Sequence, residues 1–272
     1  MGKFDGILIC TDLDGTLLRE DKSISAENKA AIEYFKKEGG FFTLVTGRMP
    51  YYVTDILKKV EPNIAFGCAN GGGLYDHIKG EYLWKCTMSD NIMQLVRCID
   101  EKFPGAGIQV CTFEKTYFAK NNDATAYFRK LTGLPNYTCN YDEVDEPISK
   151  ILFCSASQED ISGIQETLYN HPLAGEFGFI RSEKSLYEIL PKGISKGTSI
   201  TKLCEIAGID INKTIAIGDY NNDIPMFGAA GIGIAVANAC QEALDAADFV
   251  TVSNEEHAIA KVIYDLEEGK YI

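Results

Sequence analysis

Short apolar runs and amphipathic stretches alternate along the first eighty residues. The run Ile7–Cys10 is followed at once by polar residues, which is the pattern of a buried strand that ends in a loop. Apolar positions at helical spacing over 25–37, closed by two glycines, predict a helix. A strand over 41–45 and a helix over 50–59 follow in the same order. Strand, helix, strand, helix predicts a parallel sheet with right-handed crossovers.

This rhythm stops in the middle of the chain. A hairpin is predicted over 74–84, after a turn at Asn70–Gly73 that is either a simple turn or a hinge. Beyond it the predicted elements are helices over 89–102, 123–131 and 158–169 and strands over 108–112, 116–119, 151–155, 177–180 and 185–190. This mixture is typical of a separate α+β unit with an antiparallel sheet.

The alternation of helices and strands resumes after Pro191. The predicted elements are helices over 195–207, after 223, over 240–247 and from 255, and strands over 214–217, 231–236 and 249–252. We therefore predict an α/β fold class: a Rossmann-like, doubly wound parallel-sheet core formed by residues 1–80 and 191–272. Residues 81–190 are predicted to form an inserted α+β domain.

Charge and composition narrow the class of partner. The formal net charge of −13 is opposite in sign to that of a protein that binds nucleic acid. The longest uncharged run, 224–241, is broken by proline and glycines, so we expect no membrane span, and the first residues do not resemble a signal peptide. Nine cysteines without a C-x-x-C pair predict reduced thiols. We expect a cytoplasmic protein without nucleic-acid or membrane partners. The sequence predicts no particular oligomeric state.

Polar side chains follow the predicted parallel strands, at the point where each strand ends. In doubly wound sheets, ligands bind outside the carboxyl ends of the strands, so these side chains are expected to converge there. They are Asp12 and Asp14 after the first strand, Thr46, Gly47 and Arg48 after the second, and Asp219, Asn222 and Asp223 after a later one, with Lys196 near a helix start. Each segment alone is a turn, a cap or a surface lysine, and only their combination points to a site.

Four motifs in this order resemble those of the haloacid dehalogenase superfamily of phosphohydrolases. The motifs are Asp12-Leu-Asp14-Gly-Thr16, Thr46-Gly-Arg48, Lys196, and Gly218-Asp219-Tyr-Asn-Asn222-Asp223. The position of the insert, between the second and third motifs, resembles the Cof-type group, which carries the larger α/β cap of subclass IIB. This resemblance implies that residues 81–190 form the cap.

The resemblance implies roles for the first two aspartates. Asp12 is the expected nucleophile and forms an aspartyl phosphate. A carboxylate has an unperturbed pKa of about 4, so it is ionised at neutral pH and attacks phosphorus without an activating base. Asp14 is the expected acid that protonates the leaving alcohol and then the base for the attacking water. Gly15 supplies the backbone freedom that brings the two carboxylates to one site.

Converging carboxylates require a cation. Each close pair of like charges costs about 4 kcal/mol at an effective dielectric of about 20. All-oxygen ligands together with phosphate suit Mg²⁺, and the absence of His or Cys ligands argues against zinc. The resemblance places Mg²⁺ on the Asp12 carboxylate, the Asp14 backbone carbonyl and Asp219. Asn222 and Asp223 either complete the shell or support it from outside.

The remaining motif residues are expected to bind the phosphoryl group. The Thr46 hydroxyl and backbone N–H groups around Gly47 can hold phosphoryl oxygens, with Arg48 and Asn222 beside them. Lys196 is expected to neutralise the charge that develops on these oxygens, which also makes it a catalytic residue.

These expectations combine into one function. We expect a Mg²⁺-dependent phosphatase, a phosphoric monoester hydrolase, that acts on a small phosphorylated metabolite such as a sugar phosphate. Phosphoryl transfer to a second sugar phosphate, as in related mutases, is an alternative, and so is a catalytically idle sensor of a phosphorylated ligand. The cap is expected to act as a lid that selects the leaving group. Its polar residues are either substrate contacts or ordinary surface: Tyr117, Lys120, Asn121, Asn122 and Arg129.

Overall fold

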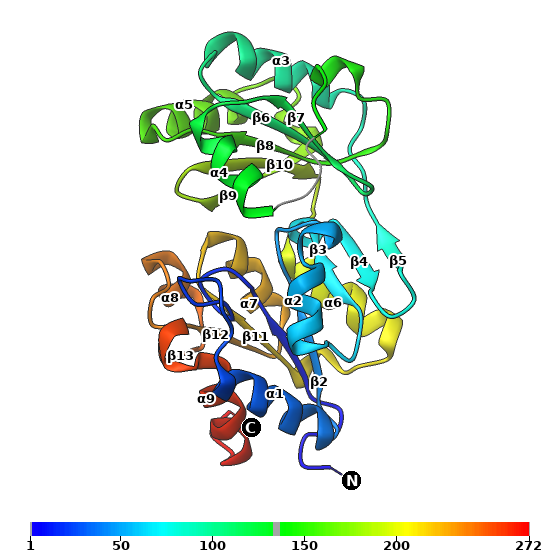
Figure 1. Cartoon of the computed structure of the whole chain (residues 1–272), viewed down its shortest axis with the longest axis vertical. Helices are drawn as coiled ribbons and strands as arrows, with labels where there is room; N and C mark the ends of the chain where they lie inside the picture. Colours follow the sequence, from blue (N-terminus) through cyan, green and yellow to red (C-terminus); the bar gives the residue numbers. More distant parts are fainter. Residues whose placement is uncertain (1, 133–136, 272) are drawn as a thin grey trace. The chain divides into compact units, whose positions relative to one another are not determined.

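The chain folds into two compact units. The computed structural model describes residues 2–132 and 137–271. One unit combines Met1–Lys85 with Ser195–Ile272, and the other is Cys86–Ile194 (Figure 1). The expected division was at 80/81 and 190/191. The first unit extends to Lys85 because strand β5 pairs with β4, and the second extends past residue 190 because strand β10 runs to Pro191.

The first unit is built on a five-stranded parallel sheet. Its order is β13-β12-β11-β1-β2, and every neighbouring pair is parallel. The strands are β1 (Leu8–Thr11), β2 (Phe41–Leu44), β11 (Thr214–Gly218), β12 (Ile232–Ala235) and β13 (Phe249–Val250). The interior strand β1 pairs with both β2 and β11 over all four residues, which confirms the predicted doubly wound core. All these strands end at the same edge of the sheet.

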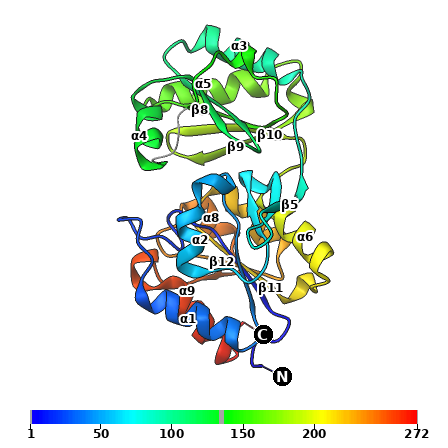
Figure 2. The same cartoon turned by 45° about the vertical axis from the view of Figure 1, so that its right-hand side comes forward.

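Helices cover both faces of this sheet because side chains alternate along each strand. Ile9 of β1 packs in the cluster with α1, α2 and α9, whereas Leu8 and Cys10 pack in the cluster with α6, α7 and α8. Figure 2 shows α1 and α9 on one side and α6 on the other. The helices are α1 (Ala26–Lys37), α2 (Thr54–Val60), α6 (Lys196–Ala207), α7 (Ile224–Ala229), α8 (Gln241–Ala246) and α9 (Ala258–Glu267).

A smaller antiparallel sheet completes the first unit. Its strands are β3 (Phe66–Cys68), β4 (Gly73–Asp76) and β5 (Glu81–Lys85), in the order β3-β4-β5. The β4–β5 hairpin was predicted, but β3 was not, because its three residues include a glycine and are too few to show alternation. A single 3-10 turn, Ala69–Gly71, joins β3 to β4.

The second unit has an antiparallel sheet of order β7-β6-β8-β10-β9. Helices α3 and α5 share an apolar cluster with one face of this sheet, and Ala124 of α4 contacts the other face at Leu152, Cys154 and Leu186. The strands are β6 (Gly107–Thr112), β7 (Thr116–Lys120), β8 (Ile148–Cys154), β9 (Phe177–Glu183) and β10 (Leu186–Pro191), and the helices are α3 (Ile92–Lys102), α4 (Asp123–Thr132) and α5 (Gln158–Tyr169).

Some element ends differ from the sequence prediction. The helix predicted over 50–59 is a 3-10 turn, Pro50–Tyr52, followed by α2. The strand predicted over 249–252 covers only two residues, and the last helix begins at Ala258, because a 3-10 turn at Asn254–Glu256 precedes it. Among the described residues, 2–132 and 137–271, no helix combines the length and the apolarity needed to cross a bilayer.

Candidate active site

The loop after β1 turns sharply and places Asp12 at the carboxyl edge of the sheet. The Asp12 amide donates to the Ile217 carbonyl over 2.8 Å, which extends the β1–β11 ladder by one residue. Gly15 has φ of +80°, and a Cβ atom there would lie 2.5 Å from Asp219 Oδ2. Only glycine fits at this position, where the loop passes against the carboxylate that follows β11.

Three carboxylates gather at this edge. Ligand oxygens of Asp12, Asp219 and Asp223 all lie within 4.8 Å of one another. Asp223 is fully buried, and its Oδ2 accepts hydrogen bonds from the backbone N–H groups of Asp219 and Tyr220. The Thr16 hydroxyl donates to Asp219 Oδ1 over 3.1 Å. Asp223 is therefore held by hydrogen bonds from its own loop, and Asp219 by one from the loop after β1.

The Lys196 ammonium connects two of these carboxylates. It lies 2.6 Å from Asp12 Oδ1 and 2.6 Å from Asp223 Oδ1, and its side chain is 1% exposed. Lys196 is the first residue of α6, whose capping box starts at Ser195. Burial alone would lower the pKa of Lys196, but attraction to the two carboxylates outweighs it and holds that pKa above its usual value. The side chain is therefore a charged, fixed part of the site.

The carboxylate cluster carries excess negative charge. With all three carboxylates ionised, one ammonium would leave two negative charges, and this crowding opposes full ionisation. Burial, together with the neighbouring carboxylates, raises the pKa of Asp12 to about 7, although Lys196 opposes this rise. Burial, together with Asp12 and Asp223, raises the pKa of Asp219 to about 8. A buried group of oxygen ligands with this charge suits a hard divalent cation such as Mg²⁺.

Asp14 belongs to a second, cationic group beside the first. Arg48 Nε donates to Asp14 Oδ2 and Arg48 Nη2 to Asp14 Oδ1, each over 2.8 Å, and Lys22 Nζ lies 2.9 Å from Oδ1. Burial alone would raise the pKa of Asp14, but Arg48 and Lys22 outweigh it and hold the pKa below its usual value. The Asp14 side chain therefore points to these cations, and its backbone carbonyl is the group expected to face Mg²⁺.

The segments that follow β2 and β11 meet through Asn70. The buried Thr46 hydroxyl accepts from the Arg48 backbone N–H over 3.1 Å. Asn222 Nδ2 donates to Asn70 Oδ1 over 3.0 Å, and a Cβ atom at Gly47 would lie 2.9 Å from that same oxygen. Gly47 and Asn222, which were expected to bind phosphate, are thus brought to one place by a residue outside the four motifs.

The structure therefore collects the predicted residues into three adjoining groups. The carboxylate cluster contains Asp12, Lys196, Asp219 and Asp223. The second group is Asp14 with Arg48. The third is Thr46, Gly47 and Asn222 near Asn70. The roles of all these residues remain predictions.

Lys22 and Asn70 are the site residues that sequence reasoning missed. Both have positive φ, 62° and 52°. A left-handed backbone at a lysine leaves no signature in the sequence. An Asn followed by three glycines is a turn signal, so the sequence predicted a turn at Asn70 but not the hydrogen bond between Asn70 and Asn222.

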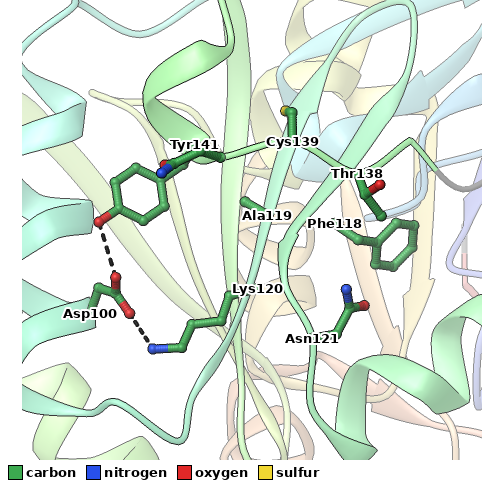
Figure 3. A pocket seen from close by; sticks show the side chains of 9 residues that line it. Asp100, Phe118, Ala119, Lys120, Asn121, Thr138, Cys139 and Tyr141 are labelled. Atoms are coloured by element: carbon green, nitrogen blue, oxygen red, sulfur yellow. Dashed lines mark hydrogen bonds and ion pairs between the residues drawn. The ribbon is translucent and has the colours of Figure 1, made fainter.

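The polar candidates of the second unit bind to other residues of the same unit. Asn122 Nδ2 donates to the carbonyls of Gly105 and Cys154, so this side chain holds the fold of the unit. Lys120 pairs with Asp100, as Figure 3 shows, at a hollow of about 460 Å³. These contacts favour the ordinary-surface interpretation for Lys120. The remaining candidates are Tyr117, which donates to Glu146, and Asn121 and Arg129, which bind each other.

Comparison with known proteins places this chain among phosphatases. Residues 9–263 match the family described as haloacid dehalogenase-like hydrolases. The chain is 32% identical over 289 residues to the 5-amino-6-(5-phospho-D-ribitylamino)uracil phosphatase YwtE of Bacillus subtilis, covering 97% of this chain and 99% of the relative. It is 25% identical to YbjI of Escherichia coli, which has the same described activity, covering 94% of each chain.

Solved structures agree with this match. A haloacid dehalogenase-like hydrolase from B. subtilis has a TM-score of 0.80 at 26% identity, covering 95% of this chain and 99% of that one. The subclass IIB sugar phosphatase BT4131 has a TM-score of 0.85 at 20% identity, covering 96% of this chain and 98% of that one. The second likeness concerns the fold, including the subclass IIB cap.

Proposed function

Because the chain belongs to the haloacid dehalogenase-like hydrolases, in their Cof-type group, and is a phosphatase acting on phosphorylated small molecules, we propose that it is a Mg²⁺-dependent enzyme. In this proposal it cleaves sugar or polyol phosphates through an aspartyl phosphate on Asp12. The observation that carries the proposal is the buried cluster of Asp12, Asp219 and Asp223 with Lys196 between two of its members.

Asp12 is proposed as the nucleophile. Its Oδ1 accepts from Lys196, which holds the carboxylate in one orientation, and this leaves Oδ2 for the phosphorus atom. The three clustered carboxylates would hold Mg²⁺, which supplies positive charge that allows a phosphate dianion to approach Asp12. Lys196 holds Asp12 and Asp223 together by charge. From this fixed position its ammonium is proposed to neutralise the negative charge that develops on the phosphoryl oxygens.

Asp14 is proposed as the group that moves protons. Arg48 and Lys22 favour the charged form of Asp14, so in this proposal Asp14 takes up a proton from solvent when Arg48 turns to the substrate phosphate. As the phosphorus–oxygen bond of the substrate breaks, the Asp14 carboxyl gives this proton to the leaving oxygen, and the phosphoryl group passes to Asp12. Asp14 then takes a proton from the water that attacks the aspartyl phosphate, which releases phosphate. Thr46, Gly47, Arg48 and Asn222 are proposed to bind the phosphoryl oxygens.

The names of the relatives support the substrate class. YwtE and YbjI are named for a phosphoribitylaminouracil and BT4131 for sugar phosphates. Both kinds of molecule are phosphate monoesters of a polyhydroxylated alcohol, and we propose this class for the present chain. The unit Cys86–Ile194 is proposed to contact the leaving group as the cap. The nine cysteines are free thiols, which supports the proposed cytoplasmic location.

The test of this function is phosphate release from a panel of phosphate esters. The panel contains p-nitrophenyl phosphate, glycerol 2-phosphate, glucose 6-phosphate and 5-amino-6-(5-phospho-ribitylamino)uracil. We expect hydrolysis with Mg²⁺, and a kcat/KM at least about tenfold higher for one of the polyol esters than for the aryl ester. EDTA is expected to abolish the activity, and added Mg²⁺ to restore it. Hydrolysis that continues unchanged in EDTA would contradict the metal dependence, and an inactive protein would contradict the whole proposal.

Asp219→Asn is expected to raise the Mg²⁺ concentration for half-maximal activity by about tenfold or more. The substitution removes one negative charge from the cluster while the amide oxygen can still accept the Thr16 hydrogen bond. Mg²⁺ titrations of initial rate measure the shift. Asp55→Asn is the matched control, because the Asp55 side chain is 87% exposed on α2. Titration curves that coincide for all three proteins would remove Asp219 from the metal site.

A further inference from the structure

Lys22 reaches the proposed active site from a tight turn in the loop after β1. The Arg19 N–H donates to the Ser23 carbonyl and the Lys22 N–H donates to the Arg19 carbonyl, both over 3.0 Å. Lys22 itself has φ of +62°, in the left-handed region that a lysine rarely adopts. Such a conformation persists only where the surrounding contacts impose it.

Contacts from a distant segment hold this loop in place. Asn238 Nδ2 donates to the Gly15 carbonyl over 2.8 Å, and Asn254 Nδ2 donates to the Leu18 carbonyl over 2.9 Å. The Glu20 N–H donates to Glu255 Oε1 over 2.8 Å. The turn that carries Lys22 is therefore fixed to the same unit that contains the carboxylate cluster.

Two cations share the Asp14 carboxylate. Arg48 contacts both oxygens with its planar fork, and Lys22 adds a third donor at Oδ1. The Lys22 side chain is 39% exposed and that of Arg48 is 20% exposed, so neither is locked inside the core. One guanidinium fork cannot make the same bidentate contact with Asp14 and with a phosphoryl group at once. A second cation on Asp14 removes this conflict.

We propose that Lys22 is a positioning residue for Asp14: its ammonium keeps the Asp14 carboxyl group directed at the reacting oxygen when Arg48 turns to the phosphoryl group. The inference rests on the proposed function, in which Asp14 gives a proton to the leaving oxygen and Arg48 binds phosphate. Lys22 takes part in no bond that forms or breaks. Its absence would leave Asp14 either held by Arg48 or without a fixed orientation.

The test compares two leaving groups in Lys22→Met, with Lys22→Arg as the conservative variant. An alkyl phosphate needs a proton on its leaving oxygen, whereas p-nitrophenyl phosphate leaves as a stable phenolate and does not. For Lys22→Met we expect kcat/KM for the best alkyl ester of the panel to fall about tenfold or more and kcat/KM for the aryl ester to change less than about threefold. The ratio kcat/KM reports the steps up to release of the leaving group, so it excludes the later attack of water on the aspartyl phosphate, in which Asp14 serves both esters alike. Lys22→Arg is expected to recover most of the alkyl activity, because it restores a cation of similar reach.

Two further variants make the outcomes distinct. Lys58→Met removes an exposed lysine of α2 and is expected to match the wild type on both esters. Asp14→Asn is expected to show the same preference for the aryl ester as Lys22→Met, but more strongly. If Asp14→Asn shows that preference and Lys22→Met loses both activities equally, or neither, the positioning role is wrong. If Asp14→Asn itself treats both esters alike, the proposed function of Asp14 fails, and the role of Lys22 falls with it.

Discussion

Asp12→Asn is expected to lower phosphate release by about 10⁴-fold or more while the fold survives. An amide is a poor nucleophile, so no aspartyl phosphate can form at this position. The fold is expected to survive because the substitution removes one of three crowded carboxylates, and the amide oxygen can still accept the Lys196 hydrogen bond of 2.6 Å. Steady-state rates with the preferred ester, together with thermal unfolding, measure both effects.

The control for Asp12→Asn is again the exposed Asp55→Asn on α2. A second readout is chemical: wild-type protein quenched in acid during turnover should carry phosphate on Asp12, and the variant should carry none. A variant that keeps a substantial part of the wild-type rate, or that is labelled to the same extent, would remove Asp12 as the nucleophile.

Lys196→Met is expected to damage both stability and activity. The substitution leaves Asp12 and Asp223 buried without their shared cation, and breaking a buried ion pair by removing one partner costs about 3–5 kcal/mol. Activity is expected to fall about 10²-fold or more, because Asp12 loses its fixed orientation and the site loses a positive charge. Chemical denaturation and steady-state kinetics on the same preparation measure the two losses.

Added Mg²⁺ distinguishes this explanation from a general loss of packing. If the carboxylates repel one another in the variant, Mg²⁺ should stabilise Lys196→Met more than it stabilises the wild type, since the cation replaces part of the missing charge. Lys58→Met, which removes an exposed lysine, should leave both measurements unchanged. Equal stability of Lys196→Met and the wild type would show that the buried ammonium does not hold the cluster.

The motif residues at the ends of the parallel strands could be predicted from the sequence, because a buried strand shows as a local run of apolar residues. Buried strands of four or five residues are visible as apolar runs, and polar residues directly after them must lie at the carboxyl edge of a parallel sheet. This is why Asp12 and Asp219 were expected together although 207 positions separate them in the sequence. The apolar faces of α1 and α9 were visible for the same reason, since a helical period repeats within a few residues.

Other features depended on contacts that no local pattern contains. Strand β3 exists because β4 pairs with it, and its three residues are too few to show a period. The end of the first unit at Lys85 follows from the β4–β5 pairing in the same way.

The sequence by itself determined which residue types stand at the ends of the parallel strands, because alternation and strand length are properties of neighbouring residues. Only the tertiary structure decided which of these side chains face each other: Lys196 against Asp12 and Asp223, and Arg48 together with Lys22 against Asp14. The pairing of Lys22 with Asp14 depends on a left-handed turn at Lys22 and on a loop fixed by residues more than 200 positions away, such as Asn238 and Asn254. The free energy of such contacts is set by geometry in space, which a one-dimensional pattern does not carry.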